Sequence, residues 1–274
     1  MRYTGRRETT EKTDSKRIGI YIANTVIIAS AIALLIFATG WLKEGLVAAQ
    51  AAEQYEVAKE EIVSSKGHEI NFSAIHTVGS EITSWLYIPG TGIDYPLVQG
   101  SDNDYFIDHD AYGNTSKAGA IFLNYSNSPS LTDPKSVIFG HNMRDGSMFS
   151  KLHNYESEAF GREHTDAYIY LDNGTVNHYK LRYYIFTDPS ADAIYLVSPE
   201  EETTQQVSAS LEDIADITYD HATGGNLICL STCTNHIYRT VVVFELVDHK
   251  RPITGVSEKM SEQGMDESSL KDEE

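Results

Sequence analysis

The chain has 274 residues, of which 41% are hydrophobic, enough for the core of one domain with appendages. It carries 40 acidic and 21 basic residues, and this net charge of −19 argues against a nucleic-acid partner, which attracts positively charged proteins. Its two cysteines cannot form a disulfide framework, so packing must stabilise the fold.

The N-terminal region predicts a membrane anchor. Residues 18–42 contain no charged side chain and would span about 37 Å as a helix, enough to cross a bilayer. Residues 1–17 carry a net charge of +3, which by the positive-inside rule predicts a cytoplasmic tail and an extracellular remainder. The alternative is a signal peptide cleaved near the small residues 48–52. The apolar run is long for a signal peptide, so we favour the uncleaved anchor.

Three further segments follow the anchor. Residues 43–71 are rich in alanine and glutamate and predict a helical linker. Residues 72–249 predict the globular domain, which would begin with a short helix over 72–78. Residues 250–274 are charged and rich in serine and glutamate, which predicts a disordered acidic tail.

The globular domain predicts many short strands and few helices. Runs of β-branched and aromatic residues predict strands at 85–88, 93–98, 118–123, 136–140, 166–171, 177–185, 193–197, 227–233 and 238–247. Asp172-Asn173-Gly174 indicates a hairpin turn. A helix is predicted to begin at Ser198, with Pro199 in its first turn and Glu201 completing a capping box. This pattern indicates a closed or nearly closed β-barrel.

His141 follows directly after the predicted strand 136–140 and Gly140. A histidine held by a rigid strand at a surface edge is well placed for acid–base chemistry. Most of the other histidines, His153 among them, lie in polar or helical surroundings. His236 is the competitor because it lies three residues from Cys233, but it sits on a connecting loop, where orientation is least fixed.

Cys233 is predicted to end one strand, and Arg239 to lie near the start of its antiparallel neighbour, within reach of it. A nearby cation favours the thiolate, which is the nucleophilic form of cysteine. Arginine cannot act as a base, so proton transfer would need a second group such as histidine. The alternative is that Cys233 is a small core residue without chemistry.

The second cysteine, Cys229, shares one strand face with Ser231 and Cys233. Four residues along a strand span roughly 13 Å, beyond disulfide reach. A zinc site from Cys229, Cys233 and His236 is conceivable. However, the C-x3-C spacing is unusual and no second ligand pair follows, so we expect no metal or other cofactor.

Three motifs together resemble the sortases, the cysteine transpeptidases of Gram-positive cell surfaces, and class B in particular. They are V-I-F-G before His141, C-L-S-T before Cys233, and Arg239 on the following strand. The similarity spans about 72–248, including residues 85–99, 103–107 and 118–125. The chain departs from the family at Cys229, where a threonine is usual, and in its short connection between Cys233 and Arg239.

The resemblance implies an eight-stranded sortase barrel in which His141, Cys233 and Arg239 form the catalytic set. It also implies substrate contacts by Asn103, Ile107 and Ser231. Such an enzyme would cleave the sorting motif of a surface protein, hold the product as a thioester and transfer it to an amine of a peptidoglycan precursor or a pilin. Two alternatives stay open. One is a membrane-tethered cysteine protease that passes the acyl group to water, and the other is a non-catalytic surface-binding domain.

Overall fold

The computed structural model describes residues 17, 20–40, 59, 62–63, 70–71, 81–198, 201–220, 222–233 and 237–250. The chain divides into two units, Met1–Val57 and Ala58–Glu274, and each is described by itself. The predicted helix over 72–78 lies outside the described residues. So do nearly all of the basic tail, most of the linker and the acidic tail beyond residue 250.

The first unit contains one described helix, Ile20–Gly40. Its 21 residues are long and apolar enough to cross a membrane, and its side chains are exposed rather than packed against protein. A soluble core helix would bury such a surface, whereas a membrane anchor or a signal sequence would not. This helix is therefore a candidate transmembrane span.

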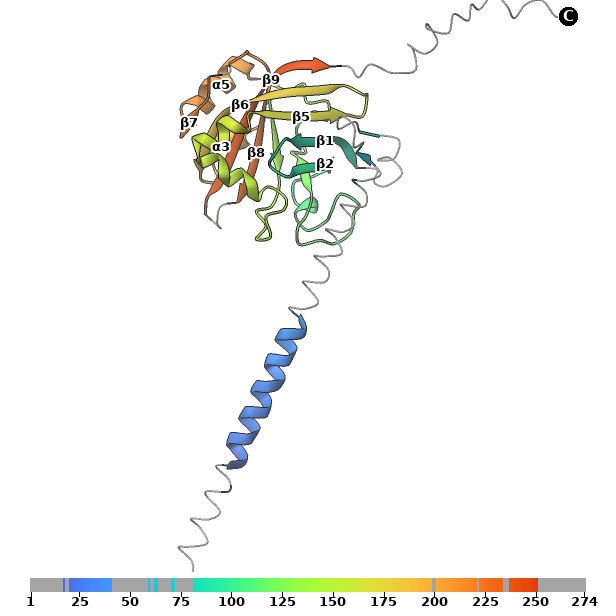
Figure 1. Ribbon diagram of the computed structural model, residues 1–274, viewed down its shortest axis with the longest axis vertical. Helices are drawn as coiled ribbons and strands as arrows, with labels where there is room; N and C mark the ends of the chain where they lie inside the picture. The colour runs from blue at the N-terminus through green and yellow to red at the C-terminus, as the bar shows by residue number, and fades with distance from the viewer. Residues whose placement is uncertain are drawn as a thin grey trace, which may run out of the picture. The chain divides into compact units, whose positions relative to one another are not determined.

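The second unit is a β-barrel (Figure 1). Its strands are β1 (Ile82–Ile88), β2 (Ile93–Gln99), β3 (Ile121–Leu123), β4 (Lys135–Phe139), β5 (Asp166–Leu171), β6 (Val176–Thr187), β7 (Ile217–Thr218), β8 (Leu227–Cys233) and β9 (Arg239–Lys250). Their order is β5-β1-β2-β3-β4-β8-β9-β6-β7, and β5 also pairs with β6. Eight strands thus close into a ring, with the two-residue β7 added beside β6. The predicted eight-stranded barrel is confirmed.

The helices are short and lie between the strands. They are the 3₁₀ helices η1 (Tyr105–Ile107) and η2 (Ser150–Glu156) and the α-helices α3 (Glu158–Glu163), α4 (Asp192–Tyr195) and α5 (Thr204–Glu212). Figure 1 shows α3 and α5 outside the barrel. Because they cover strand surface, the strands beneath them can be apolar on both faces.

Strands β8 and β9 illustrate this two-sided burial. On the inner face, Leu230 and Val242 belong to the main core cluster. On the outer face, Cys229 and Val241 pack in a second cluster with Leu211 of α5. The sequence of both strands is therefore almost continuously apolar, which explains why periodicity alone does not reveal which face is which.

Two local predictions in the segment between β6 and β8 are wrong. Residues 193–197 do not form a strand: Asp192–Tyr195 is a single helical turn, whose Ile194 is buried in the outer cluster. Helix α5 begins after Thr203 rather than at Ser198, and Thr203 forms the capping box with Gln206. Short apolar runs and capping signals are each compatible with several local structures, and packing against the barrel decides among them.

Candidate active site

Cys233 and Arg239 are direct cross-strand partners in the β8–β9 ladder, as the sequence predicts. Cys233 is the last residue of β8 and Arg239 the first of β9. Strand alternation places both side chains on the outer face, together with Ser231. The thiol is partly exposed, so a substrate can reach it.

His141 reaches the same end of the barrel through a parallel strand pair. In the register of β4 and β8, Phe139 lies beside Ser231. His141 follows Phe139 by two residues, and Cys233 follows Ser231 by two residues. Because the two strands are parallel, His141 and Cys233 lie at the same end of the pair. The amide of Gly140 donates a hydrogen bond of 3.2 Å to the Ser231 carbonyl, which extends the pairing up to the histidine.

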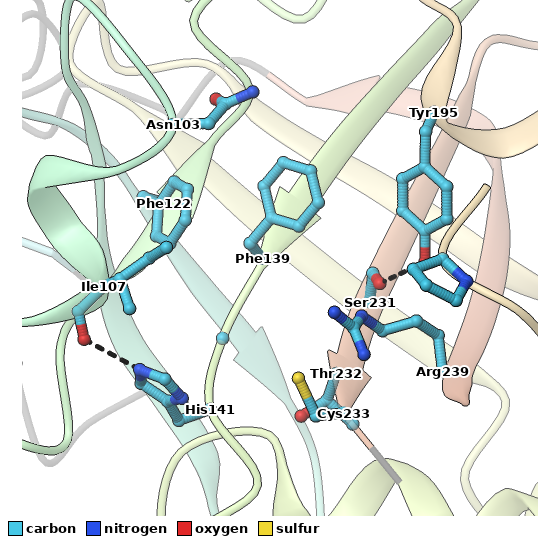
Figure 2. Close-up of a pocket in the computed structure, with 12 residues that line it drawn as sticks. Asn103, Ile107, Phe122, Phe139, His141, Tyr195, Ser231, Thr232, Cys233 and Arg239 are labelled. Atoms are coloured by element: carbon cyan, nitrogen blue, oxygen red, sulfur yellow. Dashed lines mark hydrogen bonds between the residues drawn. The ribbon is translucent and has the colours of Figure 1, made fainter. Parts of the chain in front are cut away.

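A pocket of about 420 Å³ joins these residues. All six residues predicted for the site line it, namely Asn103, Ile107, His141, Ser231, Cys233 and Arg239. In Figure 2 the sulfur of Cys233 lies between the imidazole of His141 and the guanidinium of Arg239. A thiol, an imidazole and a permanent cation therefore face one cavity, which Ile107 of η1 also lines.

The imidazole of His141 is oriented by η1. Its Nε2 lies 2.7 Å from the carbonyl oxygen of Ile107. A carbonyl oxygen can only accept, so Nε2 carries the proton of this hydrogen bond. Nδ1 is then the nitrogen left to exchange a proton in the pocket. Ile107 thus contributes its backbone to the site as well as an exposed apolar side chain.

Gly119 lies directly behind this pair. A Cβ atom at Gly119 would lie 2.6 Å from the Phe106 carbonyl oxygen, 2.7 Å from that of Ile107 and 3.1 Å from Cδ2 of His141. Its φ of +59° is also unfavourable for residues with a side chain. The absence of a side chain here lets η1 approach His141 closely enough for the hydrogen bond to form.

We expect Gly119→Ala to lower the free energy of unfolding by about 1–3 kcal/mol and to reduce activity by displacing His141. Gly92→Ala is the matched control, because Gly92 has a φ of +80° but open space around its Cβ position. Thermal unfolding and acyl-enzyme formation should be measured on both. If both variants lose the same stability and both keep full activity, Gly119 does not hold His141 in place.

Aromatic residues form the pocket wall that the sequence did not predict. The ring centroids of Phe122 and Phe139 lie 5.2 Å apart. The ring of Tyr195 stacks on Phe139 with a centroid distance of 6.2 Å. Tyr195 also shares a hydrogen bond of 2.9 Å with Ser231 Oγ. Burial raises the pKa of Tyr195 to about 12, so its hydroxyl stays protonated and can orient Ser231 but not act as a base.

The two cysteines differ sharply in environment. Cys229 is fully buried in the outer cluster, and burial raises the pKa of its thiol to about 12. It is therefore a neutral packing group at physiological pH, whereas Cys233 lines the pocket. His236 lies outside the described residues, and with it the alternative base and the zinc arrangement that would include it.

The barrel and its pocket define a protein of the sortase class, and sequence comparison supports this. The family model described as the sortase domain matches residues 86–247, more than half of the chain. The chain therefore belongs to the sortase family.

Two curated relatives are sortase B proteins. Sortase B of Listeria monocytogenes is 34% identical over 131 residues, which cover 47% of this chain and 52% of the relative. Sortase B of Staphylococcus aureus is 26% identical over 93 residues, which cover 34% of this chain and 38% of the relative. The matches thus span about half or less of these relatives' own length.

Solved sortase B structures share the fold. A structure from B. anthracis superposes with a TM-score of 0.62 at 24% identity, covering 73% of this chain and 97% of that one. One from Clostridium perfringens gives a TM-score of 0.59 at 22% identity, covering 65% of this chain and 100% of the C. perfringens chain. At these identities the likeness supports the barrel fold.

Proposed function

We propose that this protein is a membrane-anchored cysteine transpeptidase of the sortase B type. The observation that carries the proposal is the convergence of Cys233, His141 and Arg239 on one pocket. These are the three chemical groups that acyl transfer needs: a nucleophile, a proton carrier and a positive charge for the developing oxyanion. Asn103, Ile107 and Ser231, which line the same pocket, are proposed to bind the substrate.

In the first half-reaction, the Cys233 thiolate attacks a backbone carbonyl carbon in the sorting motif. The carbonyl oxygen becomes an oxyanion, which the guanidinium of Arg239 stabilises. As the tetrahedral intermediate collapses, the C–N bond breaks and protonated His141 gives its Nδ1 proton to the leaving amine. The acyl group remains on Cys233 as a thioester.

In the second half-reaction, an amine attacks the thioester carbonyl. His141, now neutral, accepts a proton from the amine as the new C–N bond forms. The C–S bond then breaks, which regenerates the Cys233 thiolate and the protonated imidazole. The donor of the amine is proposed to be a peptidoglycan precursor or a pilin. A Streptococcus pyogenes class B sortase of the same fold is described as involved in pilus biogenesis.

The helix Ile20–Gly40 is proposed to hold the enzyme in the cell membrane, with the N-terminus in the cytoplasm and the barrel outside. Substrates that are themselves membrane-bound would then meet the enzyme at high effective concentration. The anchor accordingly supports a role in attaching proteins to the cell surface.

The deciding experiment measures the products of the full-length protein with candidate sorting peptides, with and without an added amine such as triglycine. Mass spectrometry should detect a thioester adduct on Cys233 and, with the amine, a new amide product. A product that is always the free acid would favour the membrane-tethered protease. Absence of any adduct, together with failure of Cys233 to react with iodoacetamide in the native protein, would favour a non-catalytic binding domain.

A further inference from the structure

A small polar cluster lies on the face of the β8–β9 ladder opposite to the side chains of Cys233 and Arg239, and its member Thr232 also lines the edge of the active-site pocket. Thr232 and Thr240 face each other across the two strands and are buried. Thr240 Oγ1 lies 2.9 Å from Nδ1 of His153, within hydrogen-bonding distance. The two threonines lie on the same face of the ladder as Leu230 and Val242 of the apolar core, whereas His153 is half-buried. Polar groups buried in an apolar core are costly unless paired, so this cluster calls for an explanation.

The cluster lies immediately beside the proposed nucleophile. Thr232 and Thr240 form one rung of the ladder, and Cys233 and Arg239 form the next. The side chains of the two rungs point to opposite faces because strand residues alternate. A contact that fixes Thr240 from inside the barrel therefore fixes the backbone from which Arg239 projects into the pocket.

His153 is also linked to His141. It belongs to η2, which follows the loop that begins at His141. The amide of Phe149 donates a hydrogen bond of 2.9 Å to the His141 carbonyl and closes this loop. The next turn is closed by a bond of 3.1 Å from the Leu152 amide to the Phe149 carbonyl. A short hydrogen-bonded segment thus connects the backbone of His141 to the imidazole that binds Thr240.

The imidazole of His153 is held neutral beside the Thr240 hydroxyl. Burial lowers the pKa of His153, although the nearby Cys233 carbonyl and the Glu156 carboxylate act in the opposite direction. The ring is therefore neutral at physiological pH. Nδ1 faces Thr240 Oγ1, and because a hydroxyl both donates and accepts, the pair forms a hydrogen bond in either neutral tautomer of the ring.

We infer that His153 is a positioning residue, which through Thr240 holds the Cys233–Arg239 rung in register with His141. The catalytic benefit of this positioning rests on the proposed function. The hydrogen bond between His153 and Thr240 does not depend on it. His153 touches neither the pocket nor the reacting atoms. Its effect on the pocket is indirect and passes through the backbone of β9. Small displacements of Cys233, His141 and Arg239 relative to one another would slow acyl transfer.

The test uses substitutions that change one hydrogen-bonding group at nearly constant volume. Thr240→Val removes the hydroxyl, Thr240→Ser retains it, and His153→Phe keeps a ring without nitrogen. His249→Phe is the matched control, because His249 makes a similar side-chain hydrogen bond of 2.8 Å to Asn177 near the far end of β9. Steady-state kinetics with a sorting peptide, thermal unfolding and the rate of Cys233 alkylation by iodoacetamide are measured on each full-length variant.

We expect Thr240→Val and His153→Phe each to lower kcat by roughly tenfold with KM changed less than about twofold. The double variant should lose no more than either single one, because both remove the same contact. Thr240→Ser and His249→Phe should keep wild-type kcat. Unchanged kcat in Thr240→Val and His153→Phe, whatever their unfolding temperature, would overturn the inference, as would equal loss in Thr240→Ser and Thr240→Val.

The alkylation rate separates failure of this inference from failure of the proposed function. If the wild-type protein forms no acyl-enzyme with any peptide, the proposed function fails, but the reactivity of Cys233 can still be compared among variants. A severalfold change in alkylation rate in Thr240→Val and His153→Phe, absent from Thr240→Ser and His249→Phe, would support the positioning role. Identical rates in all four variants would reject it.

Discussion

Replacing Cys233 with alanine is expected to abolish thioester formation and to lower the rate of amine transfer by at least about 10³-fold. The reason is that no other described nucleophilic thiol lines the pocket, and the two half-reactions both pass through the Cys233 sulfur. Mass spectrometry of the intact protein after incubation with a sorting peptide measures the adduct directly. Chromatography of the peptide products measures transfer.

Cys229→Ala is the matched control for this experiment. The Cys229 thiol is buried, and its raised pKa of about 12 keeps it protonated, so its removal should leave activity near wild type. The small cavity left behind should lower the free energy of unfolding by about 1 kcal/mol. If Cys233→Ala still transfers the acyl group, or if Cys229→Ala is the inactive variant, the assignment of the nucleophile is wrong.

Replacing Arg239 with either alanine or lysine is expected to slow acyl-enzyme formation by about 10²–10³-fold. Alanine removes the charge that stabilises the oxyanion. Lysine keeps a charge but not the planar, multiply donating guanidinium, so it should restore little activity. Burst-phase kinetics of acyl-enzyme formation are the appropriate measurement, because they isolate the step in which the oxyanion forms.

The control for Arg239 is Arg162→Ala, which removes an arginine from an exposed ion pair with Glu158 on α3. Such surface pairs contribute little to stability, and this one is not among the pocket residues. Activity should therefore be unchanged. Full activity in Arg239→Lys would mean that charge alone suffices. Full activity in Arg239→Ala would contradict a role in oxyanion stabilisation.

The Cys233–Arg239 pair could be predicted because its signal is local. Two apolar, β-branched runs joined by a short polar connection predict an antiparallel hairpin, and the residues flanking the connection must then be neighbours. His141 could be predicted as a strand-end residue, but its convergence with Cys233 depended on the family resemblance. Parallel pairing of β4 with β8 joins segments far apart in the chain, and periodicity carries no information about which strands pair.

The pocket wall between β6 and β8 could not be predicted in the same way. The run at 193–197 resembles a buried strand because Ile194 is buried and Tyr195 packs on Phe139, yet the backbone turns helically. The true cap Thr203 and the expected cap Ser198 have similar local signals. The choice follows from where α5 must lie to bury Val207 and Leu211. His153 gives no signal in the sequence beyond its polar or helical surroundings, because its partner Thr240 is remote along the chain.

The order of the strands also determines when the active site can exist during synthesis. The ribosome releases the chain N-terminus first, so the segment containing His141 emerges well before β8 and β9. Pairings between distant segments form slowly, since a long loop must close before they are stabilised. A nascent chain that ends before β9 has the Cys233 thiol but neither the Arg239 cation nor the cover of Val241 and Val243 over the buried cysteine. The Cys233 thiol therefore gains its neighbouring cation only when β9 pairs with β8, which is also when the barrel can close.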